Sequence, residues 1–164
     1  NNTLVGINTM NTNRIVYEAL QNQTISELHH FNDIKKEAVF TSNCRFDFML
    51  HSNFSTPSIN AYLEVKNVTL VRKQGLAEFP DAVTSRGKKH AEKLIEAKKL
   101  GLEAYILYVV QREDCNQFSL AQDIDYLYYQ QVKEAISNGV KVLCYSCIVT
   151  KQEVKLNKKI NILL

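Results

Sequence analysis

The sequence predicts an α/β domain in which a mixed central sheet is flanked by helices. Two observations support this fold class. Segments with apolar residues at helical spacing alternate with apolar runs of strand length, and three of the strand patterns follow one another before that alternation begins. Consecutive strands favour antiparallel pairing and strands joined through helices favour parallel pairing, so one sheet should contain both.

The composition is that of one globular domain. The chain has 164 residues, of which 45% are hydrophobic, and it contains only five Gly and two Pro. Such a chain can bury a core and is not disordered. No apolar run approaches the ~18–20 residues of a membrane helix and no signal peptide opens the chain, so we expect a cytoplasmic protein with no membrane partner. The sequence leaves the oligomeric state open.

The first half contains one predicted helix and three predicted strands. Residues 12–22 have apolar residues at helical spacing and form the helix. Residues 33–40 and 44–50 are strands joined by the turn sequence TSN, and residues 60–73 form one long strand that ends at a QG turn. Residues 4–9 have strand composition at the start of a chain without an initiator Met, so we expect a preceding N-terminal portion.

The second half alternates helices with strands. The predicted elements are a helix over 84–99, a buried strand over 103–110, a helix over 123–138 and a strand over 140–149. Asp81 or Thr84 is the expected N-cap of the first of these helices, and Gly101 ends it. Residues 151–164 are rich in Lys and Asn and have no clear pattern, so the expected domain is 1–150 and the remainder is a C-terminal tail.

Three charged residues interrupt two of the apolar strands. Asp47 lies within CRFDFML, and Glu64 and Lys66 lie within AYLEVKNVTLV. Because side chains alternate along a strand, Glu64 and Lys66 point to one face, and Leu63 and Val65 point to the other. Burying an unpaired carboxylate costs several kcal/mol, so these groups face water, pair with one another or bind a metal. An exposed Glu–Lys pair is the simplest of these alternatives.

A divalent metal explains all three charges together. Mg²⁺ binds oxygen ligands, usually one or two carboxylates with several waters, and Mn²⁺ accepts the same ligands. Asp47 and Glu64 on neighbouring strands would share one ion, with the backbone carbonyl of Val65 beside it. Lys66 would reach the same space, where a cation orients the attacking water and stabilises the charge that grows on a phosphate. These residues are therefore candidates for a catalytic site.

The order of these elements resembles a known nuclease superfamily. A helix, three strands that carry Asp47 and the run Glu64–Lys66, then a helix and a strand are similar to the PD-(D/E)XK superfamily, with Phe46 where its motif usually has Pro. The resemblance implies a restriction-endonuclease-like core. It also implies that a Glu of the first helix joins the metal site, for which Glu18 is the candidate by position. Glu37, on the strand before Asp47, is the alternative, and either one is otherwise an ordinary surface residue.

A closer resemblance covers residues 4–150. The segments LVGINTMNTNRIVYEAL, EAVFTSNCRFDFML, YLEVKNVTLV, AEFPDAVTSRGKKHAEKL and YVVQREDCNQFSLAQDID are similar, in order and spacing, to the sugar fermentation stimulation protein A family. That resemblance implies a bacterial or archaeal cytoplasmic protein that binds DNA, with a small OB-like N-terminal domain followed by a nuclease-like domain. We expect that this chain lacks the first domain and that residues 1–150 are the nuclease-like DNA-binding domain.

Positive charge gathers on the helix that follows the acidic motif. Net charge is +3, but over residues 72–99 eight Lys or Arg stand against four Asp or Glu. Arg86, Lys89, His90 and Lys93 share one stripe of the predicted helix, at spacing i, i+3, i+4 and i+7. Such a stripe would contact DNA phosphates, aided by the helix N-terminus, or it is a solvated helix face.

Two functions follow from these features together with what the family resemblance implies. The first is DNA binding without strong sequence preference together with hydrolysis of phosphodiester bonds, in which Asp47 and Glu64 hold Mg²⁺ or Mn²⁺ and Lys66 assists the attacking water. The second is a catalytically silent DNA-binding regulator of sugar metabolism genes, which keeps the fold without turnover. The sequence leaves open which of the two applies, and hence whether the protein is an enzyme.

Overall fold

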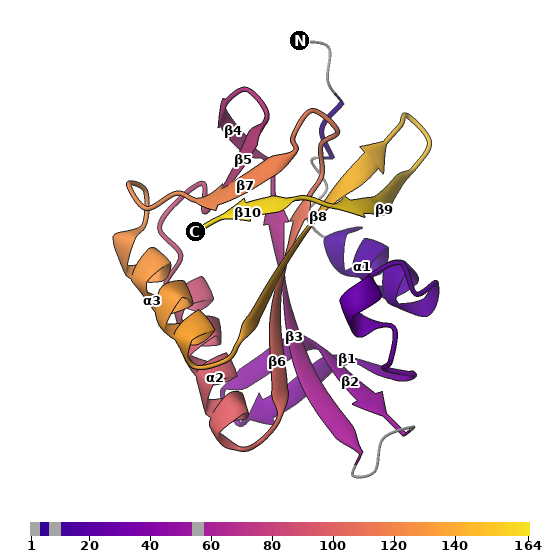
Figure 1. The fold of residues 1–164 in the computed structure, drawn as a ribbon, viewed down its shortest axis with the longest axis vertical. Coiled ribbons are helices and arrows are strands. Elements are labelled where there is room, and N and C mark those ends of the chain that lie inside the picture. Colours follow the sequence, from indigo (N-terminus) through magenta and orange to yellow (C-terminus); the bar gives the residue numbers. More distant parts are fainter. Residues whose placement is uncertain (1–3, 7–10, 54–57) are drawn as a thin grey trace.

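The computed structural model describes residues 4–6, 11–53 and 58–164. A six-stranded sheet runs through the middle of the molecule, with α1 on one side and α2 and α3 on the other (Figure 1). In spatial order its strands are β1 (Asp33–Thr41), β2 (Cys44–Ser52), β3 (Ile59–Val68), β6 (Glu103–Val110), β8 (Lys141–Val149) and β9 (Val154–Lys159). The helices are α1 (Thr12–Gln21), α2 (Ser85–Lys99) and α3 (Tyr126–Ser137), with a short 3-10 turn, η2 (Ser26–Leu28).

The main sheet is mixed, as the sequence predicts. β1, β2 and β3 pair antiparallel, β3, β6 and β8 pair parallel, and β9 returns antiparallel to β8. All five predicted strands contribute to it, and the three predicted helices form close to their expected ends. Thr84 is the N-cap of α2, since its Oγ1 accepts the N–H of Gly87 at 3.0 Å, whereas Asp81 lies outside the helix.

A second, smaller sheet was not expected from the sequence. Its strands, in spatial order, are β10 (Asn161–Leu163), β7 (Gln117–Leu120), β5 (Leu76–Phe79) and β4 (Leu70–Lys73). The prediction of one strand over 60–73 is therefore wrong, because the chain leaves the main sheet after Val68 and begins β4 at Leu70. Val68 and Val71 pack into the same core on either side of the break, so the apolar pattern shows no interruption.

Residues 151–164 also contain strands that the sequence did not predict. β9 forms one edge of the main sheet and β10 one edge of the small sheet. The buried side chains of this segment are those of Leu156 and Ile160, which are too sparse to give a strand signal. At the other end of the chain, Val5 makes an isolated bridge with Arg112, and residues 7–9 of the expected first strand lie outside the described residues.

The two faces of the main sheet carry separate hydrophobic cores. α1 packs on one face, where Leu63 and Val65 of β3 point. α2 and α3 pack on the other face, where Glu64 of the same strand meets α2. The alternation along β3 is the one that the sequence predicts. Within the described part of the chain, no helix is long and apolar enough to span a membrane.

Candidate functional site

The candidate site lies where β2 and β3 separate. The last pair of their ladder towards this end is Phe48–Leu63. The N–H of Val65, two residues further along β3, donates instead to Oδ2 of Asp47 at 2.7 Å. A side-chain carboxylate thus takes the place of a backbone acceptor at the fork between the strands. This contact explains why a charged residue occupies the middle of an otherwise apolar strand.

Asp47 is held from α1 as well. Nδ2 of Asn13 donates to Oδ1 of Asp47 at 2.7 Å. Burial raises the pKa of Asp47 above its ordinary value, and the nearby Glu64 carboxylate adds to that rise. The N–H of Val65 and the amide of Asn13 oppose it only in part. The charged form of Asp47 is therefore costly in the absence of a further cation.

Glu64 is deeply enclosed, with 4% of its surface exposed. Its Oε1 accepts a hydrogen bond from Nζ of Lys66 at 2.7 Å and another from Nδ1 of His90. Burial raises the pKa of this carboxyl, but the bonds from His90 and Lys66 outweigh burial and leave the pKa below its ordinary value. Glu64 is consequently ionised at neutral pH, with its charge offset on one oxygen only.

The other oxygen of Glu64, Oε2, is buried without a hydrogen-bond partner among the residues that the structure describes. An unpartnered buried acceptor is costly, and a hard divalent cation is the kind of group that would satisfy it. The described residues contain no group of three or more His, Cys, Asp and Glu gathered for a metal. One or two carboxylates fit a cation that keeps several waters, such as Mg²⁺, and do not make a closed cage.

A pocket of about 690 Å³ opens between the β1–β2 hairpin and the start of α2. Asp47 and His90 line it, so the pocket reaches the carboxylate site. The other charged residues of its lining are Arg86 and Lys89 from α2 and Glu37 and Arg45 from the hairpin. An anion in this pocket would meet three exposed cations, Arg45, Arg86 and Lys89. It would also meet the N-terminus of a 15-residue helix, whose backbone N–H groups favour negative charge.

The two alternatives for a third carboxylate lie in different places. Glu18 bonds Arg14 at 2.6 Å and lines a separate pocket between α1 and β9. The α1 residue that contacts Asp47 is instead Asn13. Glu37 is exposed, has a φ of +51° and lies 3.7 Å from Arg45 in an ion pair, and it lines the same pocket as Asp47.

The four residues of the expected basic stripe are also divided. Arg86 and Lys89 are exposed and line the pocket, whereas Nζ of Lys93 bonds both oxygens of Glu96 at 2.8 Å. His90 is 7% exposed and bonds Glu64, so it belongs to the carboxylate site. A signal for this was present in the sequence. The buried residues of α2 at spacing i, i+3, i+4 and i+7 are Gly87, His90, Ala91 and Leu94.

Fold and site together define a mixed α/β domain with a carboxylate pair and a lysine where two strands part, beside a basic pocket. The chain belongs to the sugar fermentation stimulation protein family. The family profile described as "Sugar fermentation stimulation protein RE domain" matches residues 10–153. The resemblance drawn from the sequence segments is thereby confirmed.

Relatives in this family carry the same description. The chain is 43% identical over 160 residues to a sugar fermentation stimulation protein homolog of Pelagibacter ubique, covering 98% of this chain and 67% of the relative. A homolog of Bartonella henselae is 41% identical over 150 residues, covering 92% and 63%. The chain thus spans about two thirds or less of the length of these relatives.

A solved structure shares the fold. "The structure of Pyrococcus Furiosus SfsA in complex with Ca2+" superposes with a TM-score of 0.87 at 20% identity, covering 99% of this chain and 68% of that one. At this identity the likeness concerns the fold, and it confirms the central mixed sheet flanked by helices.

Proposed function

We propose that this domain binds the DNA backbone in the pocket beside α2 and places a phosphodiester next to a divalent cation, Mg²⁺ or Mn²⁺, at Asp47 and Glu64. The observation that carries the proposal is the buried Oε2 of Glu64, which has no hydrogen-bond partner among the described residues. Glu64 bonds His90, and His90 lines the same pocket as Asp47. A protein that buries such an atom loses stability by it, so a bound partner is the simplest reason for its place in the fold.

The chemistry of the residues supports a hard cation. Asp47 and Glu64 would hold it through carboxylate oxygens, which are the ligands that Mg²⁺ and Ca²⁺ prefer, and the Pyrococcus furiosus relative is described in complex with Ca²⁺. When bound, such a cation supplies Lewis-acid stabilisation of a phosphate and a more acidic water. The carbonyl of Val65 remains a proposed neighbour of the ion.

The chain's own cations would position the phosphate. Lys66 is 12% exposed along its side chain and offsets the charge of Glu64. Arg86 and Lys89 are exposed at the start of α2 and line the pocket, where they would bind phosphate oxygens. Contacts to phosphates carry no direct sequence information. Binding through them would show weak sequence preference, as the sequence led us to expect.

A second function is favoured by one observation. Lys66 and His90 already satisfy one oxygen of Glu64, and the pKa of that carboxyl is low without any metal. The same arrangement therefore suits a DNA-binding regulator that seats a phosphate without hydrolysing it. Regulation of sugar metabolism genes would then be the role of the domain.

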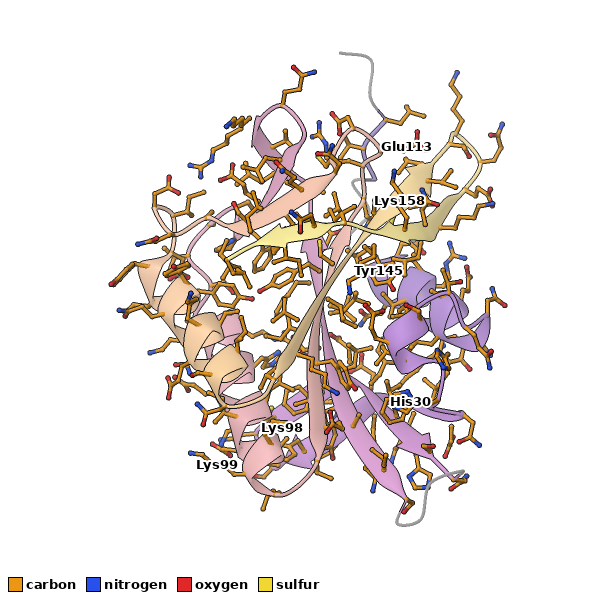
Figure 2. All side chains as sticks on the ribbon, in the orientation of Figure 1. His30, Lys98, Lys99, Glu113, Tyr145 and Lys158 are labelled. Carbon is orange, nitrogen blue, oxygen red and sulfur yellow. The ribbon has the colours of Figure 1, made fainter. Side chains whose placement is uncertain are left out.

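The binding proposal is tested by salt titration of fluorescence anisotropy on labelled duplex DNA. The double variant Arg86→Ala/Lys89→Ala should bind all sequences more weakly, and the slope of log K against log salt should fall by up to ~0.9 for each lost phosphate contact. The control is Lys99→Ala/Lys133→Ala, which removes the same charge from exposed positions outside the pocket. Lys99 lies at the far end of α2 (Figure 2). Equal losses in the two double variants would contradict a pocket-specific contact.

The two functions are separated by incubation with single- and double-stranded DNA and Mn²⁺. Cleavage that Asp47→Asn abolishes supports the hydrolase. DNA binding without cleavage, together with Mn²⁺ binding that Asp47→Asn abolishes, supports the regulator. Cleavage that persists in Asp47→Asn would come from a contaminating enzyme.

A further inference from the structure

Each of the two carboxylates of the site accepts a hydrogen bond from a helix on a different face of the main sheet. Asn13 reaches Asp47 from α1, on one face of the main sheet, and His90 reaches Glu64 from α2, on the other. The paired part of β2 and β3 ends at Phe48 and Leu63, so both carboxylate side chains lie beyond it. Neither contact is supplied by the strands that carry the carboxylates.

Asp47 needs an outside partner to keep one orientation. The N–H of Val65 fixes Oδ2, and within the described part of the chain the other hydrogen bond to this side chain is that from Asn13 to Oδ1. Because Glu64 repels this carboxylate, a single bond would leave it free to turn away. The Asn13 amide prevents that turn with a neutral group, so it adds no positive charge that would compete with a cation.

Glu64 has a comparable partner in His90. The imidazole is 7% exposed and packs edge-on against the ring of Phe46, with 5.9 Å between centroids and 68° between planes. Its position is therefore set by packing as well as by the bond from Nδ1. Lys66 and His90 both bind Oε1, so they fix the orientation of the whole carboxylate. They thereby also fix the position of Oε2, which has no partner among the described residues.

We infer that Asn13 and His90 are positioning residues that hold Asp47 and Glu64 in a cation-ready orientation, with Oε2 of Glu64 reserved for the divalent ion. This inference rests on the proposed function and assigns to it two residues from helices on opposite faces of the sheet. Ligands held in place before binding lose less conformational freedom on binding, and groups that hydrogen-bond to metal ligands typically contribute 10–100-fold to metal affinity.

The test measures Mn²⁺ affinity by isothermal titration calorimetry on the folded chain, with Tm in EDTA recorded for every variant. Asn13→Ala and His90→Gln should each weaken Mn²⁺ binding by about 10–100-fold. His90→Asn should retain most of the affinity, because the amide nitrogen of Asn lies close to the position of Nδ1, the atom that bonds Glu64. The amide nitrogen of Gln lies close to the position of Nε2 instead, so His90→Gln loses this bond. A residue that only stabilised the fold would not distinguish these two substitutions.

Two further variants keep the result interpretable. Thr84→Ala removes the N-cap of α2 and should lower Tm with Mn²⁺ affinity unchanged. Asn13→Asp places a second carboxylate against Asp47, so it should lower Tm in EDTA and show a larger rise in Tm on adding Mn²⁺ than the parent does. That larger rise requires an ion close to residue 13.

The outcomes separate the inference from the proposed function. Loss of Mn²⁺ binding in Asp47→Asn with parent-like affinity in Asn13→Ala and His90→Gln would overturn the inference alone. The inference would also be overturned if Mn²⁺ affinity fell in proportion to Tm in every variant, Thr84→Ala included. A parent chain that binds Mn²⁺ no better than Asp47→Asn would overturn both the inference and the cation site.

Discussion

Among single residues, Asp47 has opposite effects on stability and on cation binding, because its charged form destabilises the metal-free fold but is the form that binds a cation. Burial and Glu64 raise its pKa, so the folded chain holds a proton on this carboxyl more tightly than the unfolded chain does. That contribution to stability is complete below the unfolded pKa, about 3.9, and is lost as pH rises through the folded pKa. In metal-free buffer, Asp47→Asn should therefore gain stability relative to the parent as pH rises through this window. The measurement is the difference in Tm between the two proteins from about pH 3 to pH 7.5.

Addition of Mn²⁺ should reverse that order at neutral pH. A ligand at 100 times its Kd stabilises the folded state by about 2.7 kcal/mol, and the parent should show this rise while Asp47→Asn does not. The variant keeps its contact with α1, because Asn13 can turn its amide to accept from the new Asn. Equal rises in the two proteins would contradict the assignment of Asp47 as a ligand.

Alternation along strands was enough to predict that Glu64 and Lys66 share a face, and the structure brings them together with Asp47. It was not enough to predict Asn13, whose contact with Asp47 depends on where α1 docks. Glu18 comes five residues later on the same helix, which is a rotation of about 140°, so a helix that presents Asn13 turns Glu18 away. Sequence spacing alone holds no information on that docking angle.

Between elements, a buried pair of hydroxyls links β6 to α3. The hydroxyl oxygens of Tyr108 and Tyr128 are 2.6 Å apart, and both side chains are fully buried. Burial raises the pKa of each phenol, so both stay protonated and one donates to the other. Tyr128→Phe leaves the hydroxyl of Tyr108 without this partner and should lower the free energy of unfolding by about 1–3 kcal/mol. Urea denaturation measures the loss.

The double variant Tyr108→Phe/Tyr128→Phe provides the internal control for that prediction. Removing both hydroxyls leaves no unpaired polar group, so the double variant should lose less stability than the two single variants combined. Strictly additive losses would mean that the two hydroxyls do not interact.

The η2 turn is tied to β8 and β9 by an ionised carboxylate. Oε2 of Glu27 accepts from the hydroxyl of Tyr145 at 2.6 Å, and Oε1 lies 2.6 Å from Nζ of Lys159. Tyr145 lies on the α1 side of the sheet (Figure 2). Burial raises the pKa of Glu27, but the bonds from Lys159 and Tyr145 outweigh burial and lower the pKa to about 2.

This lowered pKa predicts a pH dependence of stability. The contribution of Glu27 is present above its unfolded value of about 4.3 and is lost as pH falls towards 2, because the unfolded chain then binds the proton first. Glu27→Gln should cost about 1–2 kcal/mol at pH 7 and much less near pH 2. Thermal unfolding of parent and variant across this range checks the prediction, and a difference independent of pH would refute the ionic contact.

The elements that the sequence predicted well are those with their own strong pattern. β6 is an uninterrupted apolar run because it is buried on both faces, and α2 has a cap at Thr84 and a stop at Gly101. The boundary between β3 and β4 could not be predicted, because both sides of Thr69 carry apolar residues that pack. Only the pairing of β4 with β5, instead of β6, reveals that the strand has changed sheets.

At the scale of the whole molecule, the last residues join the two sheets. The chain leaves β9 in the main sheet and enters β10 in the small sheet, as Figure 1 shows in yellow. The link between them is Ile160, whose N–H donates to the carbonyl of Cys144 at 3.0 Å and whose side chain is 5% exposed. A Lys- and Asn-rich segment with no clear sequence pattern thus holds an anchoring residue in the core shared with α2 and α3.

Ile160→Ala should show how much the molecule depends on this anchor. Removing three buried carbons leaves a cavity, and such substitutions of Ile by Ala cost about 2–5 kcal/mol of unfolding free energy. Leu163→Ala is the matched control, because that side chain is 43% exposed at the end of β10 and should cost well under 1 kcal/mol. Urea denaturation, followed by circular dichroism, measures both variants. If the two losses were equal, the segment would be a loosely attached tail, and the two sheets would be held together without it.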